Sequence, residues 1–179
     1  YISIWHKGIF IMSTNLQFIK SASGSGVGSL SITDCFSDNY DVYELFIPKI
    51  DVSGNSYLNV RFLKASDGSV DSTSNYDSAG LMLYANGSFG EGRYTNSAEF
   101  SNVFALWSTN DHNNGGLIRI YNPFNSSSYS FIQSQIANYN DVLNGSKNIG
   151  VHKVAQSNSG IQLILSNTTQ INASIYGVK

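Results

Sequence analysis

The sequence predicts an all-β protein, an antiparallel β-sandwich with a jelly-roll-like arrangement. From residue 27 onward, short runs of β-branched and aromatic residues alternate with turn clusters of Gly, Asn, Asp and Ser. No segment of helical periodicity interrupts these runs. The predicted strands include residues 27–33, 40–50, 57–65, 79–85, 103–108, 117–122, 129–137, 148–155, 161–165 and 171–178.

The run 40–50 is apolar on both faces of an extended chain, which indicates a strand near the sheet centre or one covered by a neighbouring subunit. Pro48 has no N–H to donate to a neighbouring strand, so the far end of this run is expected to be an edge or a bulge. The two apolar rows are Val42 and Phe46 on one face and Tyr43, Leu45 and Ile47 on the other.

In the predicted strands that follow 40–50, the alternation of apolar and polar residues indicates which side chains point into the core. The run 129–137 is ambiguous, because Phe131 cannot share a face with Ile132 and Ile136. We expect that strand to be covered on both sides or bulged. The inward rows elsewhere are Leu58, Val60 and Phe62 in 57–65, and Ile118 and Ile120 in 117–122.

Long connections are expected between several strands, and loops held by a rigid sandwich often carry function. The Gly- and Ser-rich stretch 21–29 precedes the strongest strands and is interpreted as a flexible arm or an N-terminal bend. The long connections are predicted at 67–77, 86–101, 110–115, 123–128 and 138–147.

One β-sandwich domain is expected over residues 12–179, since 179 residues suit a single domain and no linker divides them. Residues 1–11, YISIWHKGIFI, are apolar but shorter than the ~20 residues of a membrane span, and they lack the features of a signal peptide. We expect residues 1–11 to be a non-native translated leader before Met12. The alternative is a hydrophobic arm that extends a neighbour's sheet.

The composition narrows the classes of partner. Charged residues make up 12% of the chain, against about 25% in typical soluble domains, so neutral polar groups must supply solubility. The formal net charge is -2 and the cations are scattered singly, which excludes nucleic acid as an expected partner. A polar, weakly charged composition is common in lectins, adhesins and virion shells.

The single cysteine, Cys35, cannot form an intramolecular disulfide. A catalytic thiol requires an electropositive setting and a histidine partner, whereas Asp34 and Asp38 flank this residue. We therefore expect Cys35 to be a buried or half-buried apolar side chain beside Phe36.

The loop DGSVDSTSNYD offers a weak candidate for a metal site. Asp67, Asp71 and Asp77 supply the hard oxygen ligands that Ca²⁺ prefers. Gly68 is misplaced for an alternating-ligand loop and no Glu closes it, so a solvated hairpin connection is the favoured interpretation. No cofactor is expected.

No pattern predicts an enzyme. A glycosidase needs two facing carboxylates, and the candidates Glu44, Glu91 and Glu99 show no such arrangement. His152 lies in IGVHKV without a recognisable nucleophile motif, and the three histidines do not have the spacing of a zinc site. The sequence therefore favours a binding or assembling protein.

Tyrosine provides the best binding signal. The chain has 11 tyrosines, whose rings stack on sugars and anchor protein interfaces at low entropic cost. Core filling explains most of them. The residues predicted to contact a glycan or a partner protein are Tyr84, Tyr94, Tyr121, Tyr129 and Tyr139.

From about Met12 to Lys179 the chain resembles small virion structural proteins of marine tailed bacteriophages of the cyanophage type. The resemblance implies a structural, tail-fibre-like or capsid-decoration-like role, and it transfers no functional residues. The segments that carry it are FSDNYDVYELFI, YNPFNSSSY, IGVHKVA and SIYGVK.

Together these features predict a non-enzymatic structural protein on the surface of a phage particle, assembled in the bacterial cytoplasm. It would be a capsid decoration or a tail-fibre or receptor-binding subunit. Its expected partners are other virion proteins and further copies of itself, in a trimer, with a host-surface glycan as a further partner and no membrane contact. The alternatives are a carbohydrate-binding module or lectin-like domain and, third, a sandwich glycosidase or lyase.

Overall fold

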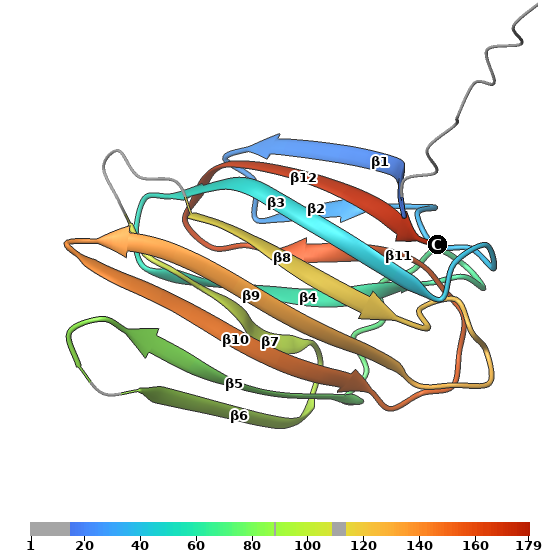
Figure 1. The fold of residues 1–179 in the computed structure, drawn as a ribbon. Coiled ribbons are helices and arrows are strands. Elements are labelled where there is room, and N and C mark those ends of the chain that lie inside the picture. The colour runs from blue at the N-terminus through green and yellow to red at the C-terminus, as the bar shows by residue number, and fades with distance from the viewer. Residues whose placement is uncertain (1–14, 88, 109–113) are drawn as a thin grey trace, which may run out of the picture.

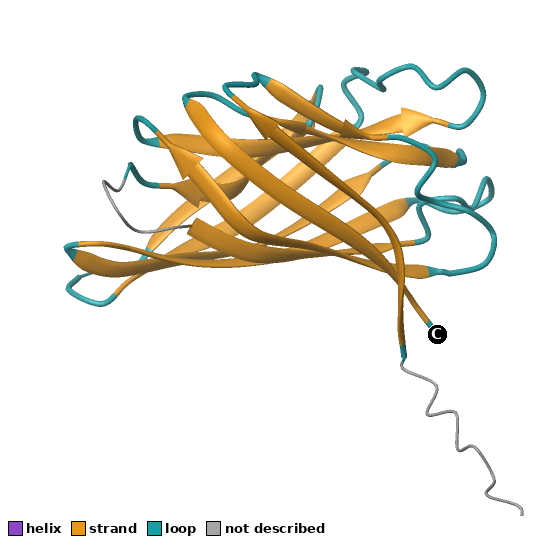
Figure 2. Cartoon of the chain, turned by 90° about the horizontal axis from the view of Figure 1, so that it is seen from above, coloured by secondary structure: helices purple, strands orange, loops and turns teal. Residues whose placement is uncertain are grey.

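The computed structural model describes residues 15–87, 89–108 and 114–179. These residues form two antiparallel β-sheets packed face to face, which confirms the predicted β-sandwich (Figure 1). Loops join the strands at the ends of the two layers (Figure 2). The predicted leader or arm, residues 1–11, lies outside the described residues.

The larger sheet has eight strands in the order β1-β12-β3-β8-β9-β10-β5-β6. Every neighbouring pair in it is antiparallel. In that order the strands are β1 (Leu16–Ser25), β12 (Thr168–Val178), β3 (Val42–Val52), β8 (Asn114–Tyr121), β9 (Ser130–Asn140), β10 (Val142–His152), β5 (Tyr76–Tyr84) and β6 (Gly90–Ser97).

The smaller sheet has four strands in the order β2-β11-β4-β7. Its pairs are antiparallel as well. These strands are β2 (Ser29–Ile32), β11 (Asn158–Ile164), β4 (Ser56–Lys64) and β7 (Phe100–Leu106).

The connectivity is that of a jelly roll with two added hairpins. Without the hairpins β5–β6 and β9–β10, the sheets reduce to β1-β12-β3-β8 and β2-β11-β4-β7. The chain then crosses between the sheets at every connection except the one from β4 to β7, which gives the two Greek keys of a jelly roll. Both hairpins extend the same edge of the larger sheet, so that sheet reaches beyond the smaller one.

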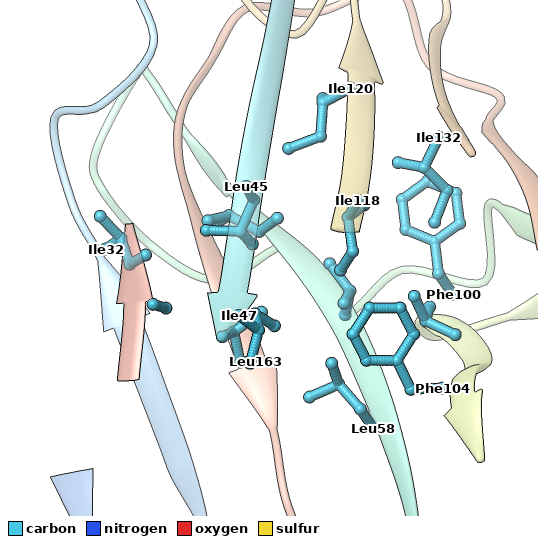
Figure 3. Close-up of a cluster of buried hydrophobic side chains, with 14 of the residues drawn as sticks. Ile32, Leu45, Ile47, Leu58, Phe100, Phe104, Ile118, Ile120, Ile132 and Leu163 are labelled. Carbon is cyan, nitrogen blue, oxygen red and sulfur yellow. The ribbon is translucent and has the colours of Figure 1, made fainter. Parts of the chain in front are cut away.

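The core lies between the sheets, where apolar side chains of both layers meet (Figure 3). All the predicted inward rows are confirmed. Leu58, Val60 and Phe62 of β4 are fully buried, as are Ile118 and Ile120 of β8. Alternation locates these rows because successive side chains of a strand point to opposite faces.

Strand β3 lies inside the larger sheet, between β12 and β8. Tyr43, Leu45 and Ile47 point into the core and are fully buried. The register with β8 shifts between Ile47 and Ile50, so the bulge predicted at Pro48 is confirmed.

Three segments differ from the sequence prediction. The stretch 21–29 is largely part of β1, the connection 86–101 contains β6, and 138–147 is a tight β9–β10 hairpin. Both β1 and β6 are edge strands of mostly exposed or half-buried residues. Because backbone pairing with β12 and β5 holds them, they need no apolar row of their own.

The free edge of β7 is covered by side chains of the larger sheet. Ser134 and Asn148 donate hydrogen bonds of 2.9 and 2.8 Å to the Val103 carbonyl. Asn138 donates to the Ala105 carbonyl at 3.1 Å. Satisfying these carbonyls prevents the edge from pairing with another chain, and it explains the polar residues on the inner faces of β9 and β10.

Candidate binding surface

The side of the eight-stranded sheet that faces away from the smaller sheet is here called the outer face. Strand parity identifies its residues: Ile132 and Ile136 of β9 are buried inward, so Phe131 points outward and is 44% exposed. The register of β9 is continuous with β8 and β10. The bulge expected as one alternative for this strand is therefore not found, and the described residues leave its outer side uncovered.

Large apolar side chains collect on the outer face. Most of the exposed large hydrophobic residues of the described chain lie there: Leu16, Phe18, Leu81, Phe131, Tyr139, Leu143 and Ile149. Most of these side chains were not predicted from the sequence as contact residues. The signal that could have found them is an apolar residue at a strand position that alternates with the buried row. The outer face is thus the least polar exposed sheet surface of the sandwich.

The opposite side of the sandwich is polar. Across the smaller sheet, Ser31, Gln162 and Arg61 form one cross-strand row, and Arg61 makes an ion pair of 2.9 Å with Glu99. Among its described residues, Tyr57 is the one large hydrophobic side chain that is exposed. The two exterior faces of the sandwich therefore differ in chemistry.

A depression with a volume of about 740 Å³ lies on the outer face over β8, β9, β10, β5 and β6. Its floor is built from two cross-strand rows, because residues paired directly across strands share a face. One row is Tyr121–Phe131–Val151–Asp77, and the next runs through Gln133, Ile149, Ala79 and Arg93. Most of these side chains are apolar or aromatic.

Most charged side chains on the outer face have a partner of opposite charge within the chain, whereas Lys147 of β10, exposed on the same face, has no ion pair among the described residues. Glu44 and Arg119 form a hydrogen-bonded ion pair across β3 and β8. The hydrogen bond to Glu44 raises the pKa of the Arg119 guanidinium. Two further ion pairs border the depression: Glu91 with Arg93 at 2.7 Å and Asp77 with Lys153 at 2.8 Å.

The five predicted contact tyrosines do not converge. Tyr121 and Tyr94 line the depression, and the Tyr121 hydroxyl hydrogen-bonds Gln133 at 2.9 Å. The Tyr94 hydroxyl accepts a hydrogen bond from Asn102 of β7, and Tyr84 packs edge-on against Trp107. Tyr129 and Tyr139 are exposed at opposite ends of β9. A shared binding role for all five stays a prediction.

The three aspartates of the weak calcium candidate have separate partners. Asp67 accepts hydrogen bonds from Ser69, Asp71 from Thr73, and Asp77 from the Asn96 N–H. Among the described residues, no group of three or more His, Cys, Asp and Glu side chains could hold a metal ion. Each carboxylate instead stabilises a turn or an ion pair.

Asp71 belongs to a buried cluster with His152 and Tyr76. Nε2 of His152 lies 3.0 Å from Oδ2 of Asp71, and the imidazole stacks on the Tyr76 ring at 4.4 Å. Gln156 donates to the same carboxylate at 2.8 Å, and the Tyr76 hydroxyl donates to the Asp71 carbonyl at 3.0 Å. The cluster ties the 65–75 loop to the end of β10.

Burial lowers the pKa of His152, although Asp71 opposes that effect. Burial by itself would raise the pKa of Asp71, but hydrogen bonds from Thr73 and the nearby His152 outweigh it, so that this pKa is lowered. Acid therefore acts against folding at both residues. Protons bind His152 in the unfolded chain below pH 6.5 and Asp71 in the unfolded chain below pH 3.8, before they bind the folded protein.

We expect the melting temperature to fall as the pH drops from 7 to 5. The His152 contribution to the free energy of unfolding is complete above its unfolded pKa and decreases by up to about 1.4 kcal/mol per pH unit below it. The His152→Gln variant should have a flatter profile over this range. Parallel profiles of the two proteins in thermal unfolding would contradict the assignment.

The other reactive side chains also have structural roles. Cys35 is 3% exposed, as predicted, and burial raises the pKa of its thiol to about 12. Among the glutamates considered for glycoside hydrolysis, Glu44 pairs with Arg119, Glu91 with Arg93 and Glu99 with Arg61. Each of these carboxylates therefore has a cation as its neighbour.

No protein-family model, no curated protein and no solved structure matches this chain. Within the described ranges, no helix of a length and hydropathy suited to crossing a membrane is found.

Proposed function

We propose that this chain is a non-enzymatic structural protein on the surface of a bacteriophage particle, either a capsid decoration or a tail-fibre or receptor-binding subunit. The observation that carries the proposal is the contrast between the apolar outer face and the polar exterior of the smaller sheet. Exposed apolar surface of this extent is typical of proteins that assemble. The resemblance of four segments to phage virion proteins supports the setting.

The side-chain chemistry supports a role without catalysis. The Cys35 thiol is buried, and its raised pKa keeps it protonated at neutral pH. His152 and Asp71 are also buried, at 0% and 2% exposure, and each contacts the other rather than an open cavity. In this proposal the sandwich presents surfaces, and the protein assembles with other virion components after synthesis in the bacterial cytoplasm.

Mass spectrometry of gradient-purified particles tests this function. The chain should copurify with the particles at a constant ratio to the major capsid protein, and antibodies against it should label intact particles. A replication enzyme of the same phage serves as the control that must be absent. Detection of the chain in infected cells but not in purified particles would contradict a structural role.

Glycan binding is the second candidate, and one observation favours it. At the depression, Phe131 lies beside Tyr121 and Gln133, so an aromatic ring adjoins hydroxyl and amide groups that can bond sugar hydroxyls. The aliphatic side chains of Ile149 and Val151 in the same depression suit an apolar partner better. A glycan array with the Phe131→Ala variant as control tests this candidate.

A further inference from the structure

We propose that the outer face of the eight-stranded sheet is a self-association interface, and that its occupant is the outer face of a second copy of this chain. This inference rests on the proposed function, because a structural subunit must assemble. It names the surface through which the assembly forms.

The size of the outer face matches that of a stable interface. Eight strands about 4.8 Å apart make a sheet about 35 Å wide, and strands of eleven residues such as β9 and β10 are about 37 Å long. With the shorter β6 and β8, the face spans about 1,000 Å², whereas a standard interface buries about 800 Å² per partner. A bound sugar would cover a small part of it.

The chemistry of the two exteriors favours the same face on the second copy. Apolar side chains such as Ile149, 61% exposed, and Leu143, 56% exposed, need an apolar counterpart. The smaller sheet presents Ser31, Gln162 and Arg61 instead. The outer face is thus the sheet exterior of this chain that offers a matching surface of the same extent, which makes the contact isologous.

Most charged side chains on the outer face already have an ion-pair partner in the same copy. Glu44 with Arg119, Glu91 with Arg93, and Asp77 with Lys153 are neutralised inside one copy. Lys147 of β10 is exposed on the same face and has no ion pair among the described residues, so it is the charge that an apposed copy must accommodate.

The positions of the exposed side chains and of the depression on the outer face indicate how the two copies are oriented. Leu143 and Tyr139 stand exposed at the β9–β10 turn, while Phe131 and Val151 line the depression near the other end of the same hairpin. These two ends are about 27 Å apart along the strand. A two-fold axis that crosses the strands places the turn of each copy over the depression of the other. The product is a dimer, in place of the trimer expected from sequence.

Light scattering coupled to size exclusion tests the interface. The unmodified chain should elute at twice its mass of 19.5 kDa at micromolar concentration. Ile149→Lys places a charge in the middle of the outer face and should weaken dimerisation by about a hundredfold or more. The control Tyr57→Lys puts the same charge on an exposed position of the opposite exterior and should leave the dimer intact.

A charge swap tests the orientation. Phe131→Glu and Leu143→Lys should each dissociate the dimer, and the double variant should restore it, because the two positions meet across the two-fold axis. Circular dichroism and melting curves establish that each variant is folded. Folding is expected because the substituted side chains are all exposed: Tyr57, Phe131, Leu143 and Ile149.

A folded monomer at 100 µM, a mass three times that of the chain, or a dimer that survives Ile149→Lys would overturn the interface. Failure of the double variant to restore the dimer would overturn the crossed orientation. A monomeric chain that is nevertheless found in purified particles would leave the proposed function standing while this inference fails. If the chain is a dimer in solution but is absent from purified particles, the interface stands and the proposed function fails.

Discussion

Replacement of Phe62 by alanine should lower the free energy of unfolding by about 3 to 5 kcal/mol. Phe62 is fully buried on β4, and its ring lies edge-on to Phe100 at 5.5 Å and to His152 at 5.6 Å. Removal of this ring leaves a cavity where both sheets meet the Asp71–His152 cluster. Urea unfolding of the unmodified and variant proteins measures the difference.

Two further variants test whether the loss of stability comes from the buried ring of Phe62. Phe62→Leu retains most of the apolar volume and should cost less than Phe62→Ala. Phe89→Ala removes the same ring from a position that is 72% exposed and should change stability by less than about 0.5 kcal/mol. Equal losses for Phe62→Ala and Phe89→Ala would show that the layer between the sheets is not a packed core.

The substitution Asp71→Ala should destabilise the protein by about 3 kcal/mol at pH 7. The Asp71 carboxylate is 2% exposed and accepts hydrogen bonds from Thr73 and Gln156, beside Nε2 of His152. Its removal leaves the buried polar groups of Thr73, Gln156 and His152 without their partner.

Asp67 provides a matched control four residues earlier. Its carboxylate accepts the same pair of bonds, from the N–H and hydroxyl of Ser69, but its side chain is 56% exposed. Asp67→Ala should therefore destabilise the protein much less than Asp71→Ala does. A similar loss for the two variants in chemical unfolding would mean that the Asp71–His152 contact adds nothing to the turn.

The candidate binding surface was only partly predictable. The apolar rows on both faces of 40–50 indicated a surface that needs cover, and Phe131 broke the alternation of its strand. Both signals identify the outer face. Among the five predicted tyrosines, only Tyr94 and Tyr121 line the depression, because aromatic content alone does not tell which face or end of a strand a ring occupies.

Local pattern was sufficient for the features that depend on local geometry. Because side chains alternate along a strand, the sequence alone determined the all-β class and the inward rows at Phe62 and Ile118. It also predicted an edge or a bulge at Pro48, which lacks an N–H, and the structure has the bulge. The burial of Cys35 was predicted because free cysteine is usually buried and this one lacks the electropositive setting and histidine partner of a catalytic thiol.

Tertiary structure decided whatever depends on long-range pairing. Strands β1 and β6 form because their backbone groups pair with β12 and β5. Their side chains do not show the apolar alternation that would have predicted a strand. Asp71 meets His152 from a position 81 residues away in the chain, which no spacing rule could reveal. Likewise, cross-strand register brings Tyr121, Phe131 and Ile149 together, because a sheet face is shared by segments that only folding makes neighbours.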